Sequence, residues 1–137
     1  MRYRVLLSDA LGPEGLARLR EQPDLDIEAK PGLSPDELCR TIGDFHALII
    51  RSGVKVTAKV LENPGKLKAH ARAGVGVDNI DLEAATAKGI LVLNTAEAST
   101  LSTAEHALAL MMSLARKIPQ ADSHVRSGQW KRNQYQG

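Results

Sequence analysis

The stretch Leu67-Lys-Ala-His-Ala-Arg-Ala-Gly-Val-Gly-Val-Asp-Asn-Ile-Asp81 decides the fold of this chain. Its first seven residues predict a strand, two glycines follow in a loop, and Asp81 can cap a helix that runs through Ala87, with Gly89 as the expected stop. A strand, a glycine-containing loop and a helix form the unit from which parallel sheets are built. Ligands of such sheets bind beyond the carboxyl ends of the strands, so the loop is the first candidate site.

Strand and helix patterns alternate on both sides of this stretch. Further strands are predicted at Tyr3–Ser8, Leu25–Ala29, Ala47–Ile50 and Ile90–Leu93, and further helices at 12–22, from Ser34-Pro35, and from Thr57 to about Pro64. Five strands with four intervening helices predict an α/β fold. With right-handed crossovers the expected architecture is a flavodoxin-like doubly wound parallel five-stranded sheet of order 2-1-3-4-5.

The pattern changes after Thr95, where the longest helical run of the chain begins. Ser99–Ile118 is apolar around much of its circumference, and Ser102-Thr-Ala-Glu105 matches a capping box. A surface helix needs only one apolar stripe, so this long C-terminal apolar helix is expected to pack against another domain or a second subunit. A central core helix is the alternative. We therefore divide the chain into residues 1–98 and 99–137, and expect a homodimer through the Leu101–Ile118 helix.

Composition excludes several classes of protein. The net charge of +2 and the aromatic content of 3% argue against a nucleic-acid partner. No leader or membrane-spanning run is visible, and the single cysteine, Cys39, favours a reducing compartment, so we predict a cytoplasmic protein without a membrane partner. No cysteine or histidine spacing predicts a metal site, and His106 cannot face its neighbour Glu105 on one helix.

Two loops combine a cation with exposed backbone amides. Arg51-Ser52-Gly53 follows the third predicted strand and suits a carboxylate or a phosphate. In the second loop Arg72 precedes Gly74, Val75 and Gly76, whose backbone can approach an anion, and Asn79 offers a donor and an acceptor. Each loop also has a purely structural explanation. Arg51 could belong to a surface ion pair, and Asp78 and Asn79 could cap the next helix.

The pair Asn94-Thr95, at the end of the fifth predicted strand, fits a hinge or a plain turn equally well. The run Gly74-Val-Gly76-Val-Asp-Asn79 is not a dinucleotide-binding fingerprint, because the third glycine is missing and the loop does not follow the first strand of the sheet.

Several runs of the chain resemble the D-2-hydroxyacid dehydrogenases, and within that family the bacterial D-3-phosphoglycerate dehydrogenase branch most of all. The resemblance rests on Arg51–Thr57, Arg72–Ala85, Lys88–Thr95, Ala104–Leu110 and Gly128–Arg132. It implies a flavodoxin-like substrate-binding domain at 1–98, with a Rossmann domain that would begin within 99–137 and whose first helix lies at the dimer interface. It also implies that residues like Arg51, Ser52, Arg72 and the Gly74–Gly76 backbone contact a small phosphorylated or carboxylate substrate in the cleft between the domains.

In that branch of the family, NAD oxidises 3-phosphoglycerate to 3-phosphohydroxypyruvate, the reaction that opens serine biosynthesis. The 137 residues contain neither the glycine-rich phosphate loop of the family nor its catalytic arginine, glutamate and histidine, and Val75 stands where some relatives have threonine. We therefore assign no catalytic residue to this chain. We expect an N-terminal portion of such an enzyme, inactive when isolated and without tightly bound NAD.

The alternative is a non-catalytic small-anion binding or interaction module of flavodoxin-like fold. A flavin-binding domain is disfavoured, because Ser8-Asp-Ala-Leu-Gly-Pro13, after the first predicted strand, has few hydroxyls to hold a phosphate.

Overall fold

The computed structural model describes residues 2–136. The chain divides into two compact units, with the boundary in the sequence between Ala98 and Ser99.

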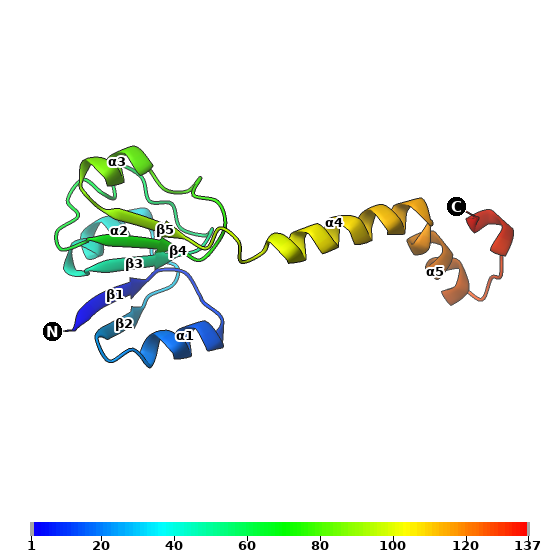
Figure 1. The fold of residues 1–137 in the computed structure, drawn as a ribbon, viewed down its shortest axis with the longest axis horizontal. Helices are drawn as coiled ribbons and strands as arrows, with labels where there is room; N and C mark the ends of the chain where they lie inside the picture. The colour runs from blue at the N-terminus through cyan, green and yellow to red at the C-terminus, as the bar shows by residue number, and fades with distance from the viewer. Residues whose placement is uncertain (1, 137) are drawn as a thin grey trace. The chain divides into compact units, whose positions relative to one another are not determined.

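The first unit is a five-stranded, fully parallel sheet of order β2-β1-β3-β4-β5, which is the predicted order (Figure 1). Helix α1 joins the first two strands, α2 and a short 3-10 helix precede β3, and α3 joins β4 to β5. The bounds are β1 (Tyr3–Leu7), α1 (Pro13–Arg20), β2 (Leu25–Ala29), α2 (Pro35–Thr41), the 3-10 helix (Ile42–Asp44), β3 (Ala47–Ile50), β4 (Ala69–Arg72), α3 (Leu82–Ala87) and β5 (Leu91–Asn94).

The two faces of this sheet differ in burial. Leu6, Leu48 and His70 stand in register on one face of neighbouring strands, and all three are fully buried. This face carries the main hydrophobic core, to which α2 and α3 contribute residues such as Leu38 and Ala85. Right-handed crossovers place α1 on the opposite face, because the chain moves from β1 to β2 in the reverse direction across the sheet.

The face shared with α1 becomes more exposed toward β5. Leu7, Ile49, Ala71 and Leu93 are register partners on β1, β3, β4 and β5. Leu7 is 2% exposed, whereas Leu93 is 49% exposed. The described part of the chain therefore leaves an apolar sheet surface over β4 and β5.

Local sequence explains how two of the helices begin. Ser34 caps α2: its hydroxyl accepts from the Glu37 amide, and its own amide donates to the Glu37 carboxylate at 2.8 Å. The Ser34 hydroxyl also donates to the Glu37 carboxylate at 2.6 Å, and this bond, followed by the one from the Ser34 amide, holds the pKa of Glu37 below its usual value. Asp81 caps α3 by accepting from the Ala84 amide at 2.9 Å. Both predicted caps are confirmed.

The helix predicted from Thr57 to Pro64 is wrong. Residues 57–65 form turns, held by single bonds such as the one from the Leu61 amide to the Thr57 carbonyl. Pro64 disfavours a helical conformation at the residue before it, and Gly65 turns the chain with a φ of +55° against the backbone of Gly43. Burial of Val60 and Leu61 anchors the segment instead, so three α-helices, not four, connect the five strands.

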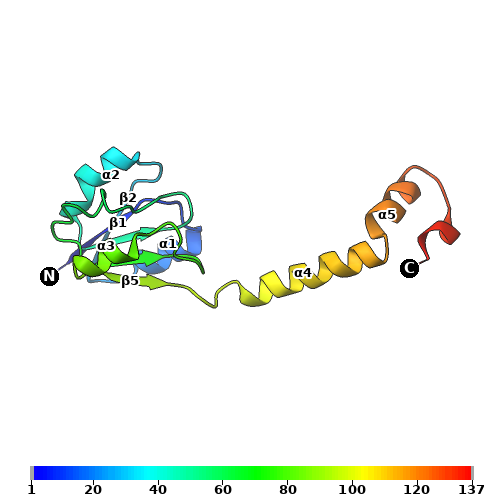
Figure 2. The ribbon, with the colours of Figure 1, turned by 90° about the horizontal axis from the view of Figure 1, so that it is seen from above.

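The second unit contains α4 (Thr100–Ala115), α5 (Ile118–Arg126) and a 3-10 helix (Arg132–Tyr135) (Figure 2). The helix predicted over 99–118 ends at Ala115, because Lys117 adopts a left-handed conformation with a φ of 51°. Ile118 opens α5 instead. The capping box predicted at Ser102–Glu105 is wrong, since the helix begins one turn earlier and Ser102 lies inside it.

Helix α4 exposes large apolar side chains. Those more than half exposed are Leu101, Leu108, Leu110, Met111, Met112 and Leu114. Within residues 2–136, no helix combines the length and the apolarity needed to cross a bilayer.

Candidate functional site

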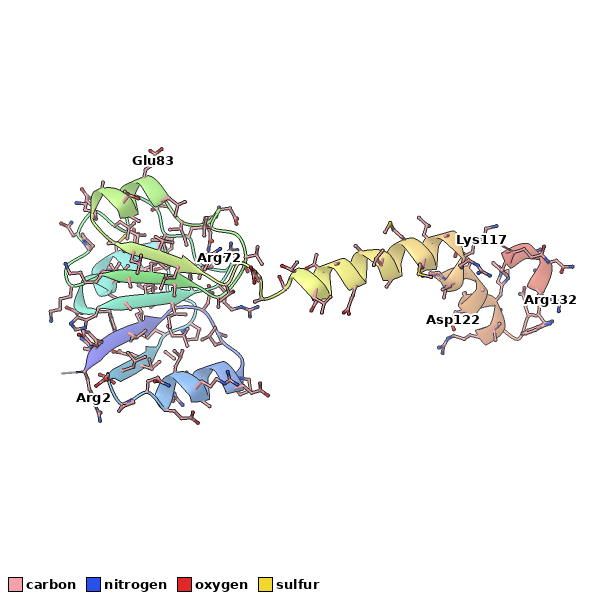
Figure 3. All side chains as sticks on the ribbon, viewed as in Figure 1. Arg2, Arg72, Glu83, Lys117, Asp122 and Arg132 are labelled. Carbon is pink, nitrogen blue, oxygen red and sulfur yellow. The ribbon has the colours of Figure 1, made fainter. Side chains whose placement is uncertain are left out.

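The two predicted loops lie at one edge of the sheet, where β3 and β4 end. The turn 51–54 follows β3, and the loop 73–79 follows β4. Figure 3 labels Arg72, the last residue of β4, at this edge. The Ala73 amide donates to the Ile50 carbonyl at 2.8 Å, so the two loops leave the sheet side by side.

Two side chains hold the ends of the turn 51–54. The Asp9 carboxylate, just beyond β1, accepts from the Arg51 amide at 2.7 Å and from the Val54 amide at 3.2 Å, both through Oδ2. The Asn79 Nδ2 donates to the carbonyl of Arg51 at 2.8 Å and to that of Val54 at 2.6 Å. The backbone groups of both end residues are therefore occupied.

The tip of the turn is left open. Among the described residues, the amides of Ser52 and Gly53 have no protein acceptor, and both residues are exposed. The Arg51 side chain is also exposed and forms no ion pair within residues 2–136. A guanidinium, a hydroxyl and two unoccupied amides form a donor set suited to a carboxylate or a phosphate.

Arg72 differs from Arg51. Its side chain is only 10% exposed, and its Nη1 lies 3.1 Å from the Asp78 carboxylate. Its Nε is buried and has no partner among the described residues. A Cβ on Gly76 would lie 2.8 Å from Arg72 Nη1 and 2.7 Å from Asp78 Oδ1. A side chain at position 76 would therefore displace this ion pair.

The end of β5 supports the glycine loop. Asn94 Nδ2 donates to the Val75 carbonyl at 2.6 Å, and the Thr95 amide donates to the Gly74 carbonyl at 3.1 Å. The amides of Val75 and Gly76 have no acceptor among residues 2–136. Asn94 and Thr95 thus orient a second pair of unoccupied donors next to the first.

Backbone bonds also join the two loops directly. The Val56 amide donates to the Asn79 carbonyl and the Asp81 amide donates to the Val56 carbonyl, each at 2.8 Å. A hollow of about 250 Å³ lies along this junction, between residues 55–57 and 78–81. A smaller one of about 130 Å³ lies beside Arg72, Leu93 and Asn94.

The predicted site residues Arg51, Ser52, Gly53, Arg72, Gly74, Val75, Gly76 and Asn79 thus come together at one edge of the sheet. Their environments differ. The exposed ones are Arg51, Ser52, Gly53, Val75 and Gly76. Asn79 is only 8% exposed, and its Nδ2 donates both hydrogens to backbone carbonyls. Sequence reasoning did not single out Asp9. An aspartate directly after a buried strand, among loops at the ligand-binding edge, was the available signal.

Other groups with chemical potential lie away from these loops. His70 is fully buried in the core, and burial lowers its pKa to about 4. In the part of the chain that the structure describes, no three His, Cys, Asp or Glu side chains are grouped to hold a metal ion.

Comparison with known proteins identifies the family of the chain. The model of the family described as D-isomer specific 2-hydroxyacid dehydrogenase, catalytic domain, matches residues 5–131. D-3-phosphoglycerate dehydrogenase of Archaeoglobus fulgidus is 46% identical over 134 residues, which are 98% of this chain and 25% of that protein. The human D-3-phosphoglycerate dehydrogenase is 45% identical, with the same two shares covered. The chain spans about a quarter of the length of these curated relatives.

Solved structures give the same relationship. A putative D-isomer specific 2-hydroxyacid dehydrogenase from Polaromonas aligns with a TM-score of 0.83 and 29% identity over 100% of this chain and 44% of its own. A Pyrococcus horikoshii protein aligns with a TM-score of 0.79 and 36% identity over 96% of this chain and 39% of its own. The family match covers nearly the whole sequence, so the chain belongs to the D-isomer specific 2-hydroxyacid dehydrogenase family.

Proposed function

We propose that this chain is the N-terminal substrate-binding portion of a NAD-dependent D-3-phosphoglycerate dehydrogenase. The parent enzyme would oxidise 3-phosphoglycerate to 3-phosphohydroxypyruvate in serine biosynthesis. The observation that carries the proposal is the pair of adjacent loops that present Arg51 and four unoccupied amides at the carboxyl edge of the sheet. The names of relatives that are 45–46% identical support the choice of substrate within the family.

In this proposal the residues of the chain bind and orient an anion. The Arg51 guanidinium supplies a full charge, while the amides of Ser52, Gly53, Val75 and Gly76 supply directed donors that need no reorganisation. Arg72 contributes positive potential from beneath the loop and remains paired with Asp78. Holding the carboxylate or phosphate group in one place fixes the carbon that carries the hydroxyl group.

NAD is assigned to the parent enzyme, in which it would accept the hydride from the substrate carbon. Two solved relatives support this choice: the Polaromonas structure is described as NAD-binding, and the 3-phosphoglycerate dehydrogenase of Entamoeba histolytica, 24% identical, contains NAD⁺. The Gly74-Val-Gly76 loop follows β4, not the first strand, and lacks the third glycine of a dinucleotide loop. We assign no residue of this chain to NAD, and we place the parent enzyme in the cytoplasm.

Titration of 3-phosphoglycerate into the ¹⁵N-labelled chain, followed through backbone amide shifts, tests the site. We expect shifts confined to Ser52, Gly53 and the segment 74–79. Arg51→Gln should weaken binding by roughly tenfold, since hydrogen bonds to charged groups contribute about 1.5–3 kcal/mol. Exposed Arg40→Gln, on α2, is the matched control.

Two further probes separate carboxylate recognition from phosphate recognition, namely D-lactate and inorganic phosphate. A well-dispersed spectrum without shifts at millimolar 3-phosphoglycerate would contradict the proposed anion site. Equal shifts with every anion, and no preference for 3-phosphoglycerate, would favour a non-catalytic anion-binding module of the same fold.

A further inference from the structure

Asp9 and Asn79 contact the turn 51–54 in a complementary way. The Asp9 carboxylate accepts hydrogen bonds from the amides of Arg51 and Val54. The Asn79 carboxamide donates hydrogen bonds to the carbonyls of the same two residues. Two side chains from different loops therefore satisfy all four backbone groups at the ends of one four-residue turn, and we call this arrangement the turn clamp.

The turn clamp determines which groups remain free for a ligand. With Arg51 and Val54 occupied at the backbone, only Ser52 and Gly53 keep unoccupied amides in the turn, at its tip. Rotation of either end residue would break two of the four bonds, so the clamp restrains the turn. The two free amides donate to neither Asp9 nor Asn79.

Gly53 belongs to the same arrangement. A Cβ at this position would lie 2.5 Å from Oδ1 of Asp9, the carboxylate oxygen that does not accept the two amides. The carboxylate would have to shift, and this shift would disturb the two bonds that Oδ2 accepts. We therefore expect a side chain at Gly53 to weaken the clamp, although a φ in the left-handed region is not required there.

We propose that Asp9 and Asn79 are positioning residues that hold the Arg51–Val54 turn in its anion-binding conformation. Neither residue contacts the substrate. Asn79 acts by hydrogen bonds that leave its Nδ2 no hydrogen for a ligand, and its Oδ1 is buried. This inference rests on the proposed function, because the turn must bind an anion for its conformation to matter in recognition.

The first test compares Asp9→Ala with Asp9→Asn in the ¹⁵N-labelled chain, with 3-phosphoglycerate and inorganic phosphate as probes. Asparagine retains one oxygen where Oδ2 accepts both amides, so Asp9→Asn should keep the response of Ser52 and Gly53. Alanine removes that acceptor, and we expect a loss of affinity of roughly tenfold with the response of Gly74–Gly76 retained. Asp26→Ala is the matched control, because Asp26 is exposed and its side chain has no hydrogen bond among the described residues.

A double-mutant cycle tests whether the two residues act as one unit. Asn79→Ala should give the same local loss as Asp9→Ala, and the double variant should be little worse than either single variant. Additive losses would overturn a single clamp. Unchanged affinity in a well-folded Asp9→Ala chain, or an equal loss in Asp26→Ala, would overturn the role of Asp9.

Amide hydrogen exchange in the absence of ligand keeps the inference separate from the proposed function. The Arg51 and Val54 amides should be protected in the unmodified chain and in Asp9→Asn, and unprotected in Asp9→Ala. If no anion binds the unmodified chain, the proposed function fails, and the exchange result still decides whether the clamp exists. Should Asp9→Ala not fold, Gly53→Ala decides, with lost protection expected and full protection contradicting the clamp.

Discussion

His70 is the least expected residue of the core. It lies between Leu48 and Val92 in the sheet register, fully buried, with neither ring nitrogen bonded to a partner among the described residues. Burial disfavours the charged imidazolium and lowers its pKa from 6.5 to about 4. The ring is therefore neutral in the folded chain at neutral pH, as an apolar core requires.

A pH dependence of stability follows from His70. Below pH 6.5 His70 binds a proton in the unfolded chain, whereas in the folded chain it stays neutral until about pH 4. The free energy of unfolding should therefore decrease as the pH falls from 6.5 to about 4. The loss should reach about 3 kcal/mol, at about 1.4 kcal/mol per pKa unit. Above pH 6.5 the contribution of His70 is constant. Urea unfolding across this range, followed by circular dichroism, measures it.

His70→Leu is the control for that measurement. Carboxylates such as Glu28 and Glu37 also have lowered pKa values, so their contribution to the free energy of unfolding also falls with the pH. Both carboxylates remain in the variant, and their contribution is the same in the two proteins. Subtraction of the two profiles isolates the histidine. Parallel profiles for the two proteins would show that His70 titrates equally in the folded and unfolded chains.

Among the elements, the turn segment between β3 and β4 depends on a close backbone approach. Gly65 has a φ of +55°, and a Cβ there would lie 2.7 Å from the Gly43 Cα atom. Gly89 has a similar φ of +66° but open space around the position of a Cβ. Substitution at Gly89 therefore measures the free-energy cost of the left-handed backbone alone, whereas substitution at Gly65 adds the cost of the close backbone contact.

Gly65→Ala and Gly89→Ala form a matched pair for thermal or urea unfolding. Gly89→Ala should cost about 1–2 kcal/mol, the penalty of a left-handed conformation for a residue with a side chain. Gly65→Ala should cost clearly more, because the loops that carry Gly43 and Gly65 must also separate. Equal costs would mean that the contact relaxes freely.

Helix α4 is the element that presents the most apolar surface. Leu108 and Met112 lie one helical turn apart and are more than half exposed. We expect this surface to drive self-association of the chain, because apolar patches of this kind on soluble proteins mark interfaces. Sedimentation equilibrium of the Leu108→Lys/Met112→Lys variant should show a weaker association than the unmodified chain.

Thr103→Lys, at an exposed position of the same helix that is already polar, controls for added charge. A chain that is monomeric at every concentration would contradict the proposed dimer helix. If the double variant associated as strongly as the unmodified chain, the interface would lie outside this helix. The exposed sheet surface at Leu91 and Leu93 would then be the next region to mutate.

At the scale of the whole molecule, the chain carries two loops that we propose to bind an anion, without an assigned proton acceptor or hydride acceptor. We therefore expect no reduction of NAD when 3-phosphoglycerate is added to the pure 137-residue chain. Absorbance of NADH provides the measurement, and a full-length relative provides the positive control. Turnover that survives further purification would contradict the assignment of no catalytic residue.

The sequence was sufficient for the sheet order and for the location of the candidate loops, because strand periodicity, Ser34 and Asp81 act locally. It was insufficient for the segment after Thr57, where burial of Val60 and Leu61 replaces helix formation. The capping box at Ser102 shows the same limit, since a pattern does not reveal which turn is the first.

The hydrogen bonds of Asp9 and Asn79 to the turn 51–54 could not be predicted from the sequence. Each makes its bonds to residues far away in the sequence, so no local pattern distinguishes a carboxamide that binds a ligand from one that binds backbone carbonyls. Sequence reasoning could name Asn79 as polar and well placed. Only the geometry separates it from the exposed donors of Ser52 and Gly53.

The turn clamp also bears on the order of folding. Its bonds connect Arg51 to Asp9 across 42 positions of the sequence and to Asn79 across 28. Closing such loops costs chain entropy before any bond compensates for it, so we expect these contacts to form after β1, β3 and β4 have assembled. During synthesis the turn leaves the ribosome before Asn79 does and is held from one side only. If the loops bind an anion as proposed, we expect this affinity to be acquired late, so that it would report the last steps by which this sheet reaches its native form.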